Sequence, residues 1–123
     1  MNEEDDYREH STEELVELYR KAASEHGKAN LRGDVATGNH AADRIAAIYR
    51  ELRSRGLEHQ RSLLPLLLSE DRGVREWAAA HSLEFEPGRG EAILIDLAKA
   101  EGMQGFNARM TLKVWHEGKL RFP

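Results

Sequence analysis

The chain of 123 residues contains no cysteine, which excludes disulfides, thiolate metal ligation and cysteine nucleophiles. Proline occupies only three positions, and aromatic residues make up 7% of the sequence. Alternating runs of Val, Ile, Thr and aromatic residues, which are typical of strands, are absent. The longest apolar run, LLPLLL, is much shorter than the roughly 20 residues that a membrane-spanning helix needs. These absences favour a soluble, all-α protein.

The charge of the chain is unevenly distributed. Charged residues form 33% of the sequence, and the formal net charge is −4. Residues 1–14 hold seven of the 22 acidic residues and one arginine, so the remaining chain carries 15 acidic and 17 basic side chains. The acidity belongs to the N-terminal segment, and we expect residues 1–10 to form a disordered acidic tail. Because this segment lacks the apolar core of a secretory signal, the sequence predicts a cytoplasmic protein.

Apolar residues recur at helical spacing along most of the chain. Ser11 and Glu14 have the spacing of a capping box, which predicts the start of a first helix that ends near residues 31–33. A second helix begins between residues 34 and 39 and ends at Gly56.

Further helices are predicted in the second half of the chain. LLPLLL forms a short helix with Pro65 in its first turn, and its apolar character on nearly every side places it between neighbours. The fourth helix is capped by Ser69 or Asp71. After the predicted loop EFEPGRGE, helices follow over about 91–100 and 104–116.

One sequence repeat occurs twice between Leu63 and Trp115. Each copy has an apolar helix, an acidic break and a second helix, and the copies are 32 residues apart when Gly73 is aligned with Gly105. Each unit has a hydrophobic face that it cannot bury alone, so such a period predicts stacked helical hairpins.

The stretch LLPLLLSEDRGVREWAAA resembles a HEAT-like repeat of the short type found in phycobilin lyases and related bacterial solenoids. In such repeats a D-x-x-V-R turn precedes an alanine-rich second helix, and its Asp and Arg bond along the turns between helices. The resemblance implies structural roles for Asp71, Val74 and Arg75. The layout of a leading helix pair, an xELRxRG stop and LLPLLxxEDxxVRxWAA also resembles a small bacterial family of domains of unknown function. The resemblance to this family implies a fold and no activity.

The predicted fold is all-α, a short HEAT-like α-solenoid of about three helical hairpins in a right-handed stack. The hairpins span residues 11–55, 57–84 and 88–117, so residues 11–117 form a single domain. Residues 118–123 are predicted to be a C-terminal tail.

No residue set in the sequence demands a catalytic reaction or a cofactor. None of the six histidines falls in an H-x-x-x-H or H-E-x-x-H pattern, and His40 with Asp43 offers too few ligands for a metal ion. Ser62 lacks the G-x-S-x-G turn of a hydrolase nucleophile. His26 and His81 lie on apolar stripes, as core histidines do. We therefore expect no catalytic residues, no metal, no cofactor and no enzymatic activity.

The remaining interpretation is a non-enzymatic protein-interaction module, either an adaptor or an immunity-like protein. Short solenoids present a rigid surface built from successive second helices, and such a surface suits a protein partner. The candidate interaction face consists of polar residues on these second helices: His40, Asp43, Arg44, Arg50, Glu76 and Lys113.

Two alternatives to protein binding stay open. A ligand-handling or lyase-associated HEAT-like protein needs an inward-facing polar cluster around His40, Asp43 and Glu76. Nucleic-acid backbone binding, as in the HEAT-like DNA glycosylases, needs a continuous basic groove, and acidic residues interrupt the basic ones here.

Two further points concern the partners of the protein. The nucleic-acid alternative requires that the arginines of the second helix share a surface with Arg75 or Lys113; these arginines are Arg44, Arg50 and Arg53. Pairing of two copies is a further alternative, in which LLPLLL and Trp115 supply the apolar surface.

Overall fold

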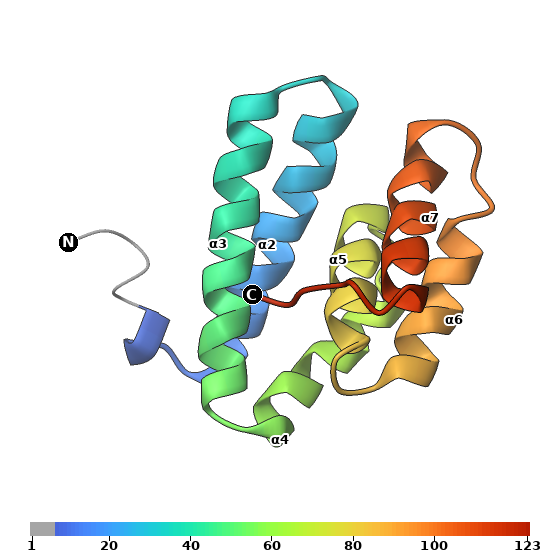
Figure 1. Ribbon diagram of the computed structural model, residues 1–123. Helices are drawn as coiled ribbons and strands as arrows, with labels where there is room; N and C mark the ends of the chain where they lie inside the picture. The colour runs from blue at the N-terminus through green and yellow to red at the C-terminus, as the bar shows by residue number, and fades with distance from the viewer. Residues whose placement is uncertain (1–6) are drawn as a thin grey trace.

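The computed structural model describes residues 7–123, and all regular secondary structure in this range is helical (Figure 1). Six α-helices and two 3-10 helices, labelled η, are present within the described residues: η1 (Tyr7–Glu9), α2 (Thr12–Leu31), α3 (Val35–Ser54), α4 (Leu57–Gln60), η2 (Arg61–Leu68), α5 (Arg72–Ser82), α6 (Pro87–Leu97) and α7 (Met103–His116). The predicted all-α class is confirmed.

Helices α2 and α5, which are separated along the chain, join the two parts of the helical packing. The long helices α2 and α3 form an antiparallel pair, α2 packs on α5, α5 on α6, and α6 on α7. Figure 1 shows the α2–α3 pair on one side of the molecule and the shorter helices α5, α6 and α7 beside it. Helix α4 and η2 connect the two groups and bring the chain from α3 to α5.

Side-chain caps determine where three of the helices begin. The Ser11 hydroxyl accepts a hydrogen bond from the Glu14 amide at 3.1 Å, and the Glu14 carboxylate accepts one from the Ser11 amide at 2.8 Å, which confirms the capping box. Asp34 and Asp71 each accept a hydrogen bond from the amide three residues later, at 3.1 and 3.2 Å. Each cap satisfies an orphan amide of the first turn. The sequence predicted the cap at Ser11, and it left Asp34 and Asp71 among alternative caps that the structure now decides.

The N-terminal prediction needs a correction. Tyr7–Glu9 form a 3-10 helix, and the Tyr7 side chain is buried, so ordered structure begins before the predicted start at residue 11. The Arg55 guanidinium donates to three carbonyl oxygens of residues 7–10, at distances between 2.7 and 3.3 Å. The remainder of the predicted acidic tail, residues 1–6, lies outside the described residues.

Two helix boundaries also differ from the predictions, and proline is the reason for both. Helix α6 begins at Pro87 instead of near residue 91, because proline is well suited to the first helical position despite the glycines that follow it. Pro65 lies in the middle of η2, not in its first turn. A proline there removes an α-helical hydrogen bond and crowds the preceding turn, which accounts for a 3-10 helix in place of the predicted α-helix.

Small residues allow the shorter helices to pack closely. A Cβ atom on Gly73 would lie 2.9 Å from the Ala23 carbonyl oxygen of α2, and one on Gly90 would lie 2.7 Å from the Ala79 carbonyl oxygen of α5. Since these contacts are with backbone atoms, a side chain at either position cannot be accommodated by a rotamer change. The two glycines therefore set the separations of α2 from α5 and of α5 from α6.

A row of rings in contact, here named the aromatic column, runs between the α2–α3 pair and α5. The Arg53 guanidinium lies over the Tyr49 ring, at 5.7 Å, and Tyr49 stacks on His81 with centroids 4.1 Å apart and planes 8° apart. Trp77 lies 5.7 Å from His81, and its other neighbour is His26, at 5.1 Å. The Trp77 indole donates a hydrogen bond to Nδ1 of His26 at 3.1 Å. As predicted, both histidines belong to the core or its boundary.

His81 is fully enclosed and neutral. The only partner of the Tyr19 hydroxyl among the described residues is Nδ1 of His81, at 2.6 Å, so the hydroxyl donates to this nitrogen. Burial lowers the pKa of His81 from 6.5 to about 3. The neutral ring therefore joins α2, α3 and α5 without a buried charge.

A polar network closes one end of the aromatic column. Gln60 donates to the Tyr49 hydroxyl at 3.0 Å, and this hydroxyl donates to the Glu84 carboxylate at 2.5 Å. Arg53 forms an ion pair with the same carboxylate at 3.2 Å. Burial and the bond to Glu84 raise the pKa of Tyr49, so its hydroxyl stays protonated as a donor.

Replacing Gly90 by alanine tests the close approach of α5 and α6. Gly90→Ala should lower the free energy of unfolding by about 1 to 3 kcal/mol, because the new methyl group meets backbone atoms. Gly88→Ala is the matched control on the same helix: a Cβ atom there meets nothing within 4 Å, and it should be neutral or stabilising by up to about 1 kcal/mol. Urea unfolding monitored by circular dichroism measures both, and equal effects would contradict the packing described.

The burial of neutral His81 predicts a pH dependence of stability. Above pH 6.5 neither the folded nor the unfolded chain protonates this ring, whereas below it only the unfolded chain does, so stability is lost as the pH falls toward about 3. Between pH 7.5 and 5 the loss due to His81 is about 2 kcal/mol. His81→Gln, which keeps a hydrogen-bond acceptor without the titration, should remove that part of the dependence. Urea unfolding at several pH values would show an unchanged slope if another group were responsible.

Candidate functional site: a basic depression on helix α2

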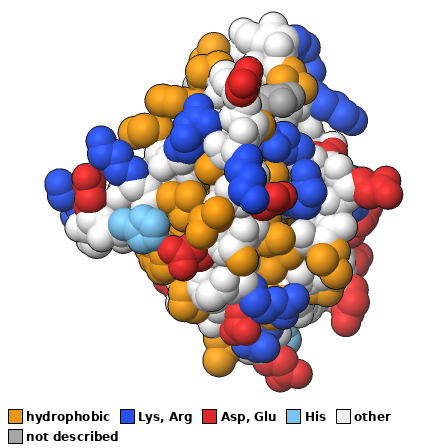
Figure 2. All heavy atoms as spheres, turned by 90° about the vertical axis from the view of Figure 1, so that its right-hand side faces the viewer, with side chains coloured by type: hydrophobic (Ala, Val, Ile, Leu, Met, Phe, Trp, Pro, Cys, Tyr) orange, Lys and Arg blue, Asp and Glu red, His pale blue; other side chains and the backbone are white. Residues whose placement is uncertain are grey.

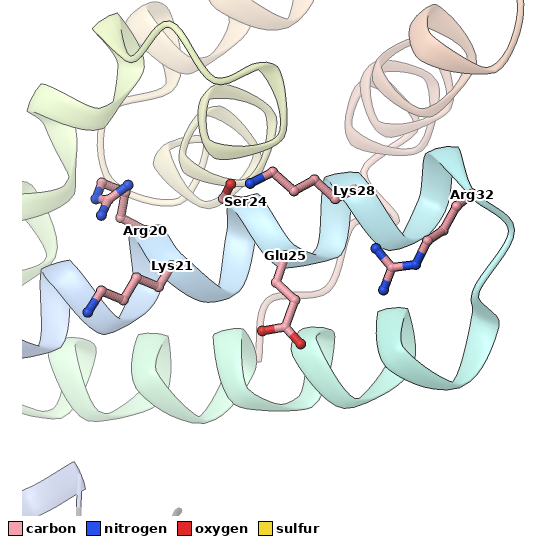
Figure 3. A pocket seen from close by; sticks show the side chains of 6 residues that line it. All are labelled: Arg20, Lys21, Ser24, Glu25, Lys28 and Arg32. Carbon is pink, nitrogen blue, oxygen red and sulfur yellow. The ribbon is translucent and has the colours of Figure 1, made fainter.

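An open depression of about 340 Å³ lies on the outer surface of α2. Figure 3 shows the six side chains that line it. All six come from α2, and four are cationic: Arg20, Lys21, Ser24, Glu25, Lys28 and Arg32.

Helical periodicity brings these side chains to one surface. Positions separated by four and eight residues lie on one face of a helix, so Arg20, Ser24 and Lys28 form one row and Lys21 and Glu25 form the next. In Figure 3 the first row points toward η2 and α5, and the second row, with Arg32, points toward α3. The depression therefore follows the helix axis between its two neighbours.

The cations of the depression differ in their pairing. Arg20 is paired with Glu17 at 2.5 Å, and Arg32 with Asp34 at 3.2 Å. Lys21 and Lys28 are exposed and form no hydrogen bond or ion pair within residues 7–123. The two lysines are thus the cations that are available to an anion from outside.

Both remaining side chains of the depression are held by neighbouring helices. Glu25 forms an ion pair with Arg44 of α3 at 2.7 Å, so its charge is compensated. The Ser24 hydroxyl donates to the Asp71 carboxylate at 2.6 Å. Burial opposes ionisation of Asp71, but hydrogen bonds from Ser24 and from the Val74 amide outweigh it and lower the pKa of Asp71. These contacts fix the orientation of α2 against α3 and α5.

The lining determines which ligands the depression suits. Small-molecule pockets are usually mainly apolar, with a few polar groups, whereas every side chain that lines this depression is charged or polar. Lysine and arginine at such a surface form charge-assisted hydrogen bonds with carboxylates and phosphates. The depression contains no histidine, so it lacks the usual base for activating its one hydroxyl group. Its chemistry is that of anion binding.

The six residues of the predicted interaction face lie on three helices, α3, α5 and α7. Among residues 7–123, no hydrogen bond or ion pair joins any two of its six members. His40, Asp43 and Arg50 lie exposed on one stripe of α3, Glu76 is half-buried on α5, and Lys113 is exposed on α7.

Burial raises the pKa of Glu76, which has no hydrogen-bond partner among the described residues. No hydrogen bond or ion pair among the described residues joins His40, Asp43 and Glu76, the cluster that a ligand-handling protein would need, and His40 and Asp43 are exposed. Within the described part of the chain, no group of three or more His, Asp or Glu side chains could hold a metal ion.

The arginines of α3 point in different directions. Arg44 and Arg53 are nine residues apart, which places them on opposite sides of a helix. Arg44 binds Glu25 of α2, Arg53 binds Glu84 beyond α5, and Arg50 is exposed without a partner among the described residues. The shared basic surface that the nucleic-acid alternative requires is not formed by these arginines.

The residues that the repeat resemblance marked as structural are placed around the start of α5. Asp71 caps α5 and binds Ser24, and Val74 is fully buried. Arg75 is half-buried, and its Nε atom is enclosed without a hydrogen-bond partner among the described residues. The bond that the resemblance implied for Arg75 is thus absent from this part of the chain, while the one for Asp71 is present.

The apolar surface expected to support pairing of two copies is largely inside the domain. Four leucines of LLPLLL are buried, and Trp115 packs against the core. Leu68 is the exposed member of LLPLLL, and a group of exposed apolar side chains lies on α7, where Met103, Phe106 and Met110 share the side that faces away from buried Ala108. Figure 2 shows the side of the molecule that carries α6 and α7, where apolar side chains alternate with charged ones of both signs.

The basic row of α2 was missed at the sequence level, although its signal was present. The apolar stripe through Leu15 and Tyr19 fixed the buried side of this helix, and the cations fall on the remaining side. The spacing did not show which residues of other helices lie beside these cations, because Arg44 and Asp71 reach the depression from α3 and from the start of α5.

None of the helices within residues 7–123 combines the length and apolarity that crossing a membrane requires.

Comparison with known proteins gives a family and a fold. The structure is similar to the crystal structure of the protein RPA1889 from Rhodopseudomonas palustris CGA009, with a TM-score of 0.85 and 25% sequence identity, over 94% of this chain and 97% of that chain. No curated protein matches the chain. Residues 13–115 match the family model of a domain of unknown function, DUF2019. The matched range includes α2 to α6 and nearly all of α7, so the chain belongs to the DUF2019 family.

Proposed function

We propose that this protein is a non-enzymatic protein-interaction module, and that the depression on α2 binds an acidic segment of a partner protein. The observation that carries the proposal is the surplus of cations there: four cationic side chains and one acidic side chain line the depression, and Lys21 and Lys28 are exposed and unpaired within the described residues. Carboxylates of a partner would supply the missing counter-charges.

The distribution of acids around the depression favours a peptide over a nucleic acid. Glu17, Glu25 and Asp34 lie among the cations and are paired with arginines. A phosphate backbone carries a charge at every step and would meet these acids at close range. A peptide with spaced carboxylates can place its acids at the lysines and neutral groups elsewhere.

The burial of a strongly perturbed histidine supports a non-enzymatic role. His81, the most strongly perturbed imidazole, is enclosed in the core, where its ring stacks on Tyr49 and binds Tyr19. It is therefore inaccessible as a base. No cofactor or metal is part of the proposed function, and an adaptor or an immunity-like protein would need none.

We infer further that the helices form a short HEAT-like solenoid of three hairpins with a right-handed stack. The contacts of α2 with α3, of η2 with α5, and of α6 with α7 support this grouping, and so does the 32-residue spacing of the last two units. In such a stack, neighbouring units hold each helix rigid, so the cations of α2 would be presented in a fixed pattern.

Charge reversal on α2 tests the proposal. The probe is a fluorescein-labelled peptide of alternating glutamate and glycine, and binding is followed by fluorescence anisotropy at low and at moderate salt. The double variant Lys21→Glu and Lys28→Glu should weaken binding at least about tenfold, because close opposite charges across an interface contribute more than 1 kcal/mol. Binding by the wild-type protein should weaken as the salt concentration rises.

The matched control reverses two lysines outside the depression. Lys99→Glu with Lys113→Glu produces the same net charge and should change the affinity by less than about threefold, since screening limits the effect of distant charges. Equal losses in the two double variants would mean that only net charge matters. Tighter binding of single-stranded DNA than of the acidic peptide, lost in the α2 variant, would instead establish nucleic-acid binding.

A further inference from the structure

The segment that follows α7 turns back across the molecule. Gly118 has a φ of 73°, its amide donates to the Trp115 carbonyl at 2.9 Å, and the Lys119 amide donates to the Val114 carbonyl at 2.9 Å. This is the Schellman arrangement, in which a glycine in the left-handed region ends a helix and reverses the chain. Figure 1 shows the following residues running from the base of α7 past α5 to α3.

Residues 119–123, here named the strap, lie on the domain as an extended peptide. They form no helix or strand, and their burial alternates: Leu120 and Phe122 are half-buried and pack against the core, while Lys119 and Arg121 are exposed. Alternate side chains of an extended chain point in opposite directions, so two apolar side chains two residues apart enter the same surface. This is how extended peptides are held by the proteins that bind them.

The far end of the strap is bound by α3. The Arg53 guanidinium donates to the carbonyl oxygen of Pro123, and the same group is held by Glu84 and lies over the Tyr49 ring. Arg53 is therefore oriented before it meets the strap. A donor fixed in this way recognises a main-chain oxygen, and it places no demand on the side chain at that position.

The backbone of the strap is attached weakly. Among the described residues, no backbone–backbone hydrogen bond involves residues 120–123, and the bond from Arg53 is their one hydrogen bond to the domain. The attachment consists of two half-buried side chains and one carbonyl contact. Helix α7 and the core beneath do not depend on hydrogen bonds from the strap.

We propose that the strap is displaceable and that its seat is a second protein-binding site, for an extended partner segment with the same pattern of a leucine, one residue and a phenylalanine. Such a segment supplies two apolar anchors and a carbonyl group for Arg53. The strap competes with it as an attached ligand, and the tether raises the effective concentration of the strap to roughly millimolar, so the free seat is rarely available in the wild-type chain.

The test uses the full-length chain and a peptide copy of residues 118–123 with a fluorescent label at its N-terminus. Phe122→Asp places a charge on the strap and should release it, and the variant should then bind the peptide at least tenfold more tightly than the wild-type protein does. A control peptide with aspartate at both apolar positions should not bind either protein. Arg121→Asp, at an exposed position of the strap, is the matched control and should behave as the wild-type protein does.

Circular dichroism and unfolding experiments show whether the variants keep their helices. If Phe122→Asp loses helical structure, Phe122→Ala replaces it as a milder release. A folded variant that does not bind the peptide, or a wild-type protein that binds it equally well, would overturn the proposal. Dimers of the wild-type protein that disappear in Phe122→Asp would also overturn it, because they would show that two copies exchange their straps.

Lys21 and Lys28 lie outside the strap contacts. The double variant Lys21→Glu and Lys28→Glu should therefore bind this peptide as the wild-type protein does, which separates this proposal from the preceding one.

Discussion

The contact on which the rest of the structure depends is the stacking of the neutral His81 ring on Tyr49, with Tyr19 bound to its nitrogen. The three side chains come from α5, α3 and α2, so a single buried ring fixes the positions of three helices. The contact holds only while the ring is uncharged, because an imidazolium in this position would be buried without a compensating acid. The low pKa of His81 is the consequence of this burial.

Helix α2 connects the core to the proposed binding surface. Leu15 and Tyr19 lie fully buried on one side of this helix, while Lys21 and Lys28 are exposed on the other. The same helix cannot rotate to pair its lysines without removing Tyr19 from His81. The core contacts therefore keep both lysines on the exposed side of α2, where neither forms an ion pair within the described residues, and Lys28 lies near enough to Asp71 to help lower the pKa of that carboxyl.

The sequence predicted features that depend on neighbours along the chain, and it did not predict those that depend on neighbours in space. The capping box at Ser11, the ends of α2 and the burial of His81 follow from local spacing, and all were predicted correctly. The sequence could not show whether the α3 arginines share a surface, because the directions of Arg44 and Arg53 are set by different partner helices. No spacing rule links Arg53 to Pro123, which lies 70 residues away.

The far end of the strap contacts a polar network around Glu84, while the two apolar side chains of the strap pack on the core. Glu84 accepts hydrogen bonds from Tyr49, Gln60 and Arg53, so its carboxylate keeps two of its partners even if Arg53 turns outward. Gln60 is buried and holds the Tyr49 hydroxyl from the side of α4. Displacement of the strap would expose Leu120, Phe122 and the part of the core that they cover, and it would free the main-chain oxygen of Pro123. Since the entropy of ordering the strap opposes its contacts, a site held this weakly is suited to exchange.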